Sequence, residues 1–116
     1  MAGLVELVPV AAFEELVADA LDGLPEGFGF SNVVVVVEDE KPGQPNLLGL
    51  YEGVPLTHRE HYTGTLPDRI TLFRHPLCRH AVDLDDLVRE IRVTVMHEFG
   101  HHVGLDEHRL HELGWA

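Results

Sequence analysis

The feature that most constrains the fold is a long amphipathic helix near the C-terminus, predicted from about Leu84 to Val103. Asp83 is a favourable N-cap, and Asp85 and Asp86 fall in the first turn, where the helix dipole stabilises negative charge. Gly104 follows and can adopt the left-handed conformation that ends a helix. The helix has a single apolar stripe, formed by Leu84, Leu87, Val88, Ile91 and Val95.

A second amphipathic helix is predicted near the N-terminus, where Gly23 and Pro25 are placed to end it. Its apolar positions are Phe13, Leu16, Val17, Ala20, Leu21 and Leu24. The short apolar segment from Leu4 to Val8 predicts a strand that precedes this helix. The β-branched run from Val33 to Val37 predicts a strand that is buried on both faces and lies at the centre of a sheet.

Two further strands are predicted from Leu47 to Tyr51 and from Arg69 to Arg74. The segment that contains Pro76 and Cys78 is predicted to be a loop, with Cys78 as a small buried or loop residue. A short final helix is predicted close to the C-terminus.

Length and composition limit the class of protein. With 116 residues and 45% hydrophobic content, the chain is predicted to be one α+β domain over residues 1–116. The formal net charge of −12 would repel phosphate backbones and anionic lipids, so nucleic acid and membrane surfaces are not expected partners. The N-terminus does not resemble a secretory signal, and the single cysteine allows no internal disulfide. These features predict a cytoplasmic protein.

The long helix carries the motif His97-Glu98-x-x-His101 near its C-terminal end. Residues four apart share one face of a helix, so the rings of His97 and His101 can bind the same metal ion. Glu98 points about a quarter turn away. From there it can reach a water on that ion without being a ligand itself.

A third ligand is expected where the chain turns back after Gly104. The spacing H-E-x-x-H-x-x-G-x-x-E is that of zinc peptidases whose third ligand lies three residues after the glycine, as histidine in metzincins or aspartate in Asp-zincins. Glu107 occupies this position in the present chain. Asp106 has the familiar residue type one step early, and His108 can ligate a metal but lies one step late. Glu107 is therefore the predicted ligand, with Asp106 and then His108 as alternatives.

Most of the chain resembles the small bacterial minimal zincin family of metallopeptidases. The resemblance is carried by the valine strand before an acidic turn and by FEELVADALDGLPE (13–26), LLGLYEGVPLTHR (47–59), LPDRITLFRHPL (66–77) and VTVMHEFGHHVGLDEHRLHELGW (93–115). It implies a small mixed sheet packed on an N-terminal helix and on the HExxH helix, with a short C-terminal helix. It also implies one zinc ion per chain, held by the two histidines and an acidic residue, with a glutamate as base.

The resemblance extends to features around the site. The family lacks the methionine turn of metzincins, and no methionine follows Met96 in this chain. In the family a C-terminal aromatic residue supports the site, and Trp115 is placed for that role. Homodimers occur among such proteins, so the resemblance also suggests a homodimer.

Two imidazoles and one carboxylate leave a fourth position on zinc for water, which is typical of catalytic sites. Glu98 can accept a proton from that water and deliver it to the leaving amine, so hydrolysis of a peptide or a flexible protein segment is predicted. If the strand from Arg69 to Arg74 is an exposed edge, as the family suggests, an extended peptide could pair with it. Candidates for a second oxyanion donor, each better explained as an ordinary surface residue, are His58, His61, Tyr62 and Arg74.

Two other functions remain open. A non-catalytic zinc-binding module for interaction or regulation could retain the same motif, although a structural zinc site has no use for the base Glu98. A hydrolase of small non-peptide amides would use the same chemistry. Manganese, iron or cobalt could also occupy these ligands in place of zinc.

Overall fold

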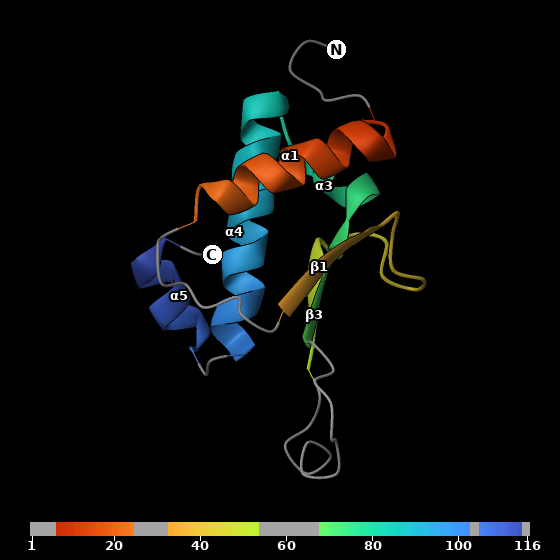
Figure 1. Cartoon of the computed structure of the whole chain (residues 1–116). Helices are drawn as coiled ribbons and strands as arrows, with labels where there is room; N and C mark the ends of the chain where they lie inside the picture. Colours follow the sequence, from red (N-terminus) through yellow and green to blue (C-terminus); the bar gives the residue numbers. More distant parts are fainter. Residues whose placement is uncertain (1–6, 25–32, 54–67, 103–104, 115–116) are drawn as a thin grey trace.

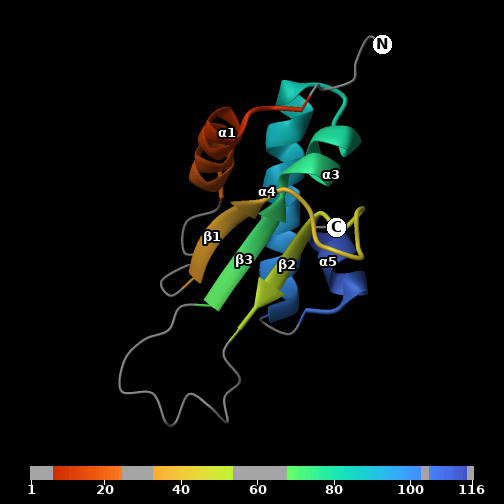
Figure 2. The same ribbon diagram turned by 90° about the vertical axis from the view of Figure 1, so that its right-hand side faces the viewer.

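Three strands form one mixed sheet in the computed structural model of the chain (Figures 1 and 2). β3 (Asp68–Phe73) lies in the middle, parallel to β1 (Val33–Glu38) and antiparallel to β2 (Gly49–Glu52). The α+β class predicted from the sequence is confirmed. The residues that the structure describes are 7–24, 33–53, 68–102 and 105–114.

The order of the strands differs from the prediction. The run from Val33 to Val37 is predicted at the buried centre of the sheet, but β1 lies at an edge of the described sheet, and Val34 is 42% exposed. β3 is central instead, and its residues from Ile70 to Phe73 are buried. Because β-branched residues favour strands anywhere in a sheet, the valine run indicates the strand but not its place. The suggestion that β3 is an exposed edge is also wrong, and the edge beside α4 (Leu84–His102) belongs to β2.

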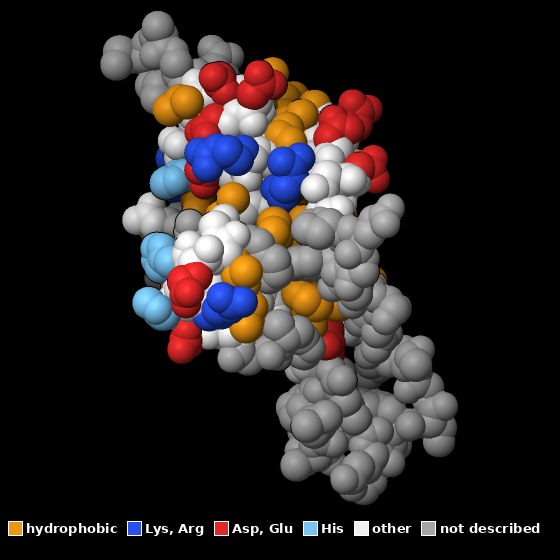
Figure 3. Space-filling view, turned by 90° about the vertical axis from the view of Figure 1, so that its left-hand side faces the viewer, with side chains coloured by type: hydrophobic (Ala, Val, Ile, Leu, Met, Phe, Trp, Pro, Cys, Tyr) orange, Lys and Arg blue, Asp and Glu red, His pale blue; other side chains and the backbone are white. Residues whose placement is uncertain are grey.

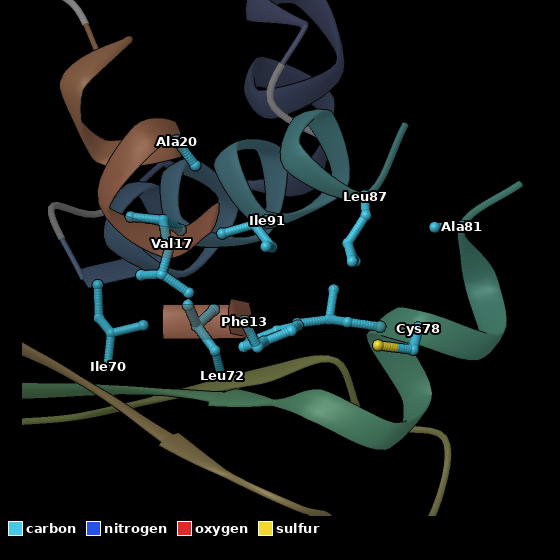
Figure 4. Close-up of a cluster of buried hydrophobic side chains, with 11 residues drawn as sticks. Phe13, Val17, Ala20, Ile70, Leu72, Cys78, Ala81, Leu87 and Ile91 are labelled. Atoms are coloured by element: carbon cyan, nitrogen blue, oxygen red, sulfur yellow. The ribbon is translucent and has the colours of Figure 1, made fainter. Parts of the chain in front are cut away.

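Two helices, α1 (Val10–Asp22) and α4, cover the same face of the sheet, as Figures 1 and 2 show. Both predicted helices are confirmed, although Leu84 of the expected stripe is exposed because it is the first residue of α4. Burying a leucine or isoleucine side chain stabilises a fold by about 1.5–3 kcal/mol. The core between the helices and the sheet therefore holds α4 firmly, and it consists of Phe13, Val17, Ala20, Ile70, Leu72, Leu77, Cys78, Ala81, Leu87, Ile91 and Val95 (Figure 4).

The segment predicted as a loop around Pro76 is a helix, α3 (Arg74–His80). Proline is tolerated there because it lies in the first turn, where a backbone N–H has no partner within the helix. Leu77 and Cys78 are buried against the core, and this tertiary packing stabilises a helix too short for a clear periodic signal. The expectation that Cys78 is a small buried residue is confirmed.

Two further predicted elements lie near the ends of the sequence. The predicted strand from Leu4 to Val8 lies largely outside the described residues, and Leu7 and Val8 themselves are not in a strand. The predicted final helix is confirmed as α5 (Glu107–Leu113). Among the described residues, no helix is long and apolar enough to cross a membrane.

Candidate metal centre

The two histidines of the motif lie side by side near the C-terminal end of α4. The ring centroids of His97 and His101 are 4.7 Å apart, and their planes make an angle of 82°. The two side chains are 27% and 43% exposed, whereas Val95 and Met96 of the same helix are buried. The amphipathic character of α4 thus buries its apolar residues and leaves the histidine pair accessible to a small ligand.

Glu107, the first residue of α5, completes a group of three side chains with these histidines. Its Oε1 atom lies 2.8 Å from Nε2 of His101 and 3.3 Å from Nε2 of His97. One ligand atom from each residue lies within 4.8 Å of the others. Zinc binds such atoms tetrahedrally at about 2.0–2.2 Å, which places its ligands roughly 3.3 Å from one another. The donor types and their spacing therefore fit a zinc ion.

The docking of α5 on α4 places Glu107 in this group. The N–H of Leu105 donates to the carbonyl of Gly100 at 2.9 Å, which turns the chain back at the end of α4. Leu110 is fully buried, and a Cβ atom on Gly100 would overlap its Cδ2 atom. Glu107 lies three residues before Leu110, so both side chains share the face of α5 that meets α4. The glycine inside the HExxH motif thus permits a close approach that brings the third side chain to the histidines.

The two alternative third ligands have other contacts. Asp106 is the N-cap of α5, and its Oδ1 atom accepts a hydrogen bond from the N–H of Arg109 at 2.9 Å. His108 is exposed, and its Nε2 atom lies 3.3 Å from Oε1 of Glu112. Neither residue belongs to the group formed with His97 and His101. The geometry therefore favours Glu107, the first of the three predicted candidates.

Glu98 stands beside this group but is held by a different element. Its Oε1 atom accepts a hydrogen bond of 3.0 Å from the backbone N–H of Tyr51 on β2. Partial burial raises the pKa of Glu98 above its ordinary value, while the Tyr51 N–H and the two histidines act in the opposite direction. The carboxylate of Glu107 adds to the increase. One oxygen of Glu98 is therefore fixed by β2, and Glu98 does not belong to the group formed by His97, His101 and Glu107.

The contact between Glu98 and β2 depends on a glycine that sequence reasoning did not place in the site. A Cβ atom on Gly49 would lie 2.6 Å from Cγ2 of Thr94 and 3.6 Å from Cγ of Glu98. Thr94 and Glu98 lie one helical turn apart on α4. Gly49, which meets Thr94, and Tyr51, which bonds to Glu98, are alternate residues of β2. An isolated glycine within a predicted strand is a signal of close backbone approach, so it could have indicated this contact.

Tyr51, the last residue of the strand predicted from Leu47, links the site to the sheet. Its hydroxyl donates a hydrogen bond of 2.8 Å to Oδ2 of Asp68, which is buried at the start of β3. This bond fixes the end of β2 from which the N–H of Tyr51 points to Glu98. A backbone donor can come from any residue type, so the sequence carries no direct signal for it.

A groove of about 480 Å³ opens beside the motif, between α4 and the segment that leads into β2. Leu48 and Gly49 line one wall, Thr94 lines the other, and His97 and Glu98 lie at one end. On the face of the molecule drawn in Figure 3, histidine side chains gather along one margin near acidic side chains. The candidate metal centre thus adjoins a hollow in which part of a substrate could lie.

Of the remaining predicted site residues, Arg74 is described by the structure, and it lies away from this centre. Arg74 is buried at the start of α3, where it donates hydrogen bonds to Oδ1 of Asp39 at 2.8 and 3.2 Å and to the carbonyl of Val8 at 2.6 Å. Its role is therefore structural. Arg74 is neither the oxyanion donor nor the ordinary surface residue that the sequence suggested. The other predicted candidates lie outside the described residues: His58, His61, Tyr62, Gly104 and Trp115.

A mixed sheet, an HExxH helix and an acidic side chain returned by a short C-terminal helix together define a zincin-like domain. The family model of the zincin-like metallopeptidases matches residues 30–115, and the chain belongs to this family. A solved structure, a conserved hypothetical protein from Thermus thermophilus, is similar with 27% identity and a TM-score of 0.56. The similarity covers 82% of this chain and 94% of that one. A search of curated proteins found no match.

Proposed function

We propose that the chain is a zinc-dependent peptidase in which His97, His101 and Glu107 hold the ion and Glu98 is the general base. The observation that carries this proposal is the position of Oε1 of Glu107, 2.8 and 3.3 Å from the two Nε2 atoms. Glu98 is next to this group but bonded to β2, which suits a base rather than a ligand. Membership of the zincin-like family supports zinc binding.

The reaction assigns a proton-transfer role to Glu98. When bound, zinc would lower the pKa of a coordinated water to about 7 and polarise the substrate carbonyl. Glu98 accepts a proton from the attacking water at Oε2, because Oε1 is engaged by the N–H of Tyr51. It then delivers this proton to the amine nitrogen as the C–N bond breaks. In the metal-free protein, burial raises the pKa of Glu98, which is the direction that strengthens a base.

The edge of β2 supports a peptide as the substrate. The carbonyl of Leu48 accepts a hydrogen bond from Phe73 of β3, so the polar groups of Leu48 point into the sheet. Alternate residues of a strand point these groups to opposite sides, so those of Gly49 face away from β3, as does the N–H of Tyr51, which is already bonded to Glu98. An extended peptide in the groove would lie along this edge, with its scissile bond near Glu98.

Metal analysis and peptide hydrolysis together test the proposal. We expect about one zinc per wild-type chain after dialysis against trace zinc, and loss of that zinc in His101→Ala and Glu107→Ala. Glu98→Gln is expected to retain zinc but to lose hydrolysis of a peptide library by at least about 100-fold, which is the lower end of a general base's contribution. Zinc binding without any Glu98-dependent hydrolysis would contradict the peptidase assignment.

A non-catalytic zinc-binding module is the second candidate function. The observation in its favour is that Glu107 lies on a separate short helix, so a metal ion would tie α5 to α4. In that case, removal of zinc should lower thermal stability, and Glu98→Gln should change neither stability nor the binding of a partner. A panel of small amides, assayed beside the peptides, separates the peptidase from a hydrolase of non-peptide amides.

A further inference from the structure

The groove beside the metal centre extends well beyond the HExxH motif. From His97 and Glu98 it follows α4 to Glu90 and Arg89, a distance of about 12 Å along the helix axis. An extended peptide rises about 3.3 Å per residue, so roughly four residues separate the two ends. The groove therefore has a distal end that a substrate of ordinary length would reach.

A second hollow of about 240 Å³ continues the groove at that distal end. It shares Asn46, Leu48 and His80 with the first hollow and adds Pro76 and Arg79 of α3. The groove thus passes from the edge of β2 to the C-terminal part of α3. α3, which sequence analysis predicted as a loop, supplies one side of this distal end.

Arg79 places a cation at this distal end of the groove. Its Nη2 atom donates a hydrogen bond of 2.6 Å to the carbonyl of Pro45, which holds the side chain against the turn before β2. No acidic side chain pairs with Arg79 in the part of the chain that the structure describes. Arg89, by contrast, pairs with both Asp86 and Glu90. A guanidinium has five N–H donors, so Arg79 keeps several for a ligand.

We propose that Arg79 binds a carboxylate of the substrate, at least about four residues from the scissile bond. This inference rests on the proposed function, because it takes the groove to hold the substrate of that site. The planar guanidinium matches a carboxylate with two parallel hydrogen bonds. His80 lies next to Arg79 and can donate a further hydrogen bond to this carboxylate. Its Nε2 atom also lies 3.5 Å from Oε2 of Glu90. The carboxylate belongs either to an acidic side chain or to the C-terminus of a peptide.

The side chains that line the groove between its two ends indicate which kind of substrate residue lies between the scissile bond and the carboxylate. Leu47 and Leu48 line one side of the groove and Val93 lines the other. A chain of net charge −12 repels acidic peptides at long range, so a single carboxylate matched to Arg79 is favoured over a run of acids. The expected substrate is a mainly apolar segment with one acidic group at its distal end.

Peptide binding tests this inference separately from catalysis. The zinc-loaded Glu98→Gln variant is titrated, by fluorescence anisotropy, into short apolar peptides with blocked ends. One glutamate is moved along each peptide and compared with glutamine at the same place, and a further pair compares a free C-terminal carboxylate with an amide. We expect the carboxylate to strengthen binding at one register by about 1.5- to fivefold, the range of an exposed ion pair, and less at high salt.

Matched variants of two arginines test whether the preference for a carboxylate depends on Arg79. Arg79→Gln should abolish the preference for the carboxylate, and Arg79→Lys should retain part of it. Arg69→Gln removes the same charge from an exposed residue near the other end of β3 and should leave the preference intact. A preference that is absent, or that falls equally in Arg79→Gln and Arg69→Gln, would overturn the inference. If wild-type protein cleaves no peptide while the Arg79-dependent preference persists, the proposed peptidase function fails and this binding site stands.

Discussion

At the scale of single residues, the candidate metal centre depends on two adjacent acids with different tasks. Asp106 caps α5 through its bond to the N–H of Arg109, whereas Glu107 points to His97 and His101. The cap stabilises the start of α5, whereas the contact between Leu110 and Gly100 sets the position of α5 on α4. A substitution at either acid should thus affect a different property of the protein.

We predict that Glu107→Gln weakens zinc binding by at least about 100-fold, since even residues that only support a ligand contribute 10–100-fold. Asp106→Ala should leave zinc binding nearly unchanged but should lower the free energy of unfolding by about 1 kcal/mol, because it removes the N-cap. Competition with a chromophoric chelator measures the first effect, and urea unfolding of the metal-free protein measures the second. Loss of zinc binding in Asp106→Ala with retention in Glu107→Gln would reverse the assignment of the two acids.

At the scale of elements, the sequence predicts the helices and strands whose signal is a local residue pattern. It does not predict the order of the strands in the sheet, which depends on partners distant in the sequence. The periodicity of Leu87, Ile91 and Val95 correctly predicts α4 and its buried face. The valine run predicts a strand but not that β3 lies between β1 and β2, because strand order is decided by pairing over long sequence separations. The residue types of HExxH are visible in the sequence, whereas the Tyr51 N–H that holds Glu98 has no residue-type signature.

The close approach of α4 to β2 can be tested through Gly49. Gly49→Ala adds a methyl group 2.6 Å from Cγ2 of Thr94, so α4 and β2 must separate, and the bond between Glu98 and the Tyr51 N–H should lengthen. If the proposed peptidase activity is present, we expect kcat to fall by about tenfold, as for a misplacement of a catalytic group by a fraction of an ångström. Zinc affinity should change little.

The double variant Gly49→Ala/Thr94→Ser removes the conflicting Cγ2 atom and should restore most of kcat. Thr94→Ser alone is the control and should have nearly wild-type kcat and zinc affinity. A loss of zinc equal to the loss of kcat in Gly49→Ala would mean that the whole end of α4 has moved, rather than Glu98 relative to β2.

The approach of α5 to α4 has a parallel test at Gly100. A methyl group at Gly100 would overlap Cδ2 of Leu110, so Gly100→Ala should displace α5 and carry Glu107 away from the histidines. We expect zinc affinity to fall by about 10–100-fold, the range for groups that orient a ligand. Leu110→Val removes the Cδ2 atom, and the double variant Gly100→Ala/Leu110→Val should recover part of the lost affinity. Equal zinc affinity in the wild type and Gly100→Ala would show that the position of Glu107 does not depend on this contact.

At the scale of the whole molecule, the hydrogen bonds of Arg74 connect separate segments of the chain at the end of the domain that carries α3. This end lies away from α5 and the candidate metal centre (Figure 2). Arg74 joins the end of β1, through Asp39, to the segment before α1, through the carbonyl of Val8. The same Asp39 oxygen lies 3.7 Å from Nε2 of His75. Because the contact between Arg74 and Asp39 lies away from the candidate metal centre, it can be altered without changing the residues proposed to hold zinc.

The Arg74 contact should appear in the pH dependence of stability. The hydrogen bond from Arg74 is the main reason that the pKa of Asp39 lies below its ordinary value of 3.8. A carboxyl group with a lowered pKa in the folded state stabilises that state fully above its ordinary pKa, and this contribution disappears as the pH falls through the lower, folded value. We therefore predict that Asp39→Asn has a lower Tm than the wild type at neutral pH. The difference should stay constant down to about pH 5 and should shrink on further acidification.

Thermal unfolding of the metal-free proteins from neutral pH to pH 3 measures this difference. The raised pKa of Glu98 acts with the opposite sign, because its protonated form is favoured in the folded state. Both proteins share Glu98, so its contribution cancels when the two curves are subtracted. Asp19→Asn, at an exposed position of α1, removes the same charge away from Arg74 and should follow the wild-type curve. If Asp39→Asn differs from the wild type equally at pH 3 and pH 7, Asp39 stabilises the fold through its shape and hydrogen bonding rather than through its charge.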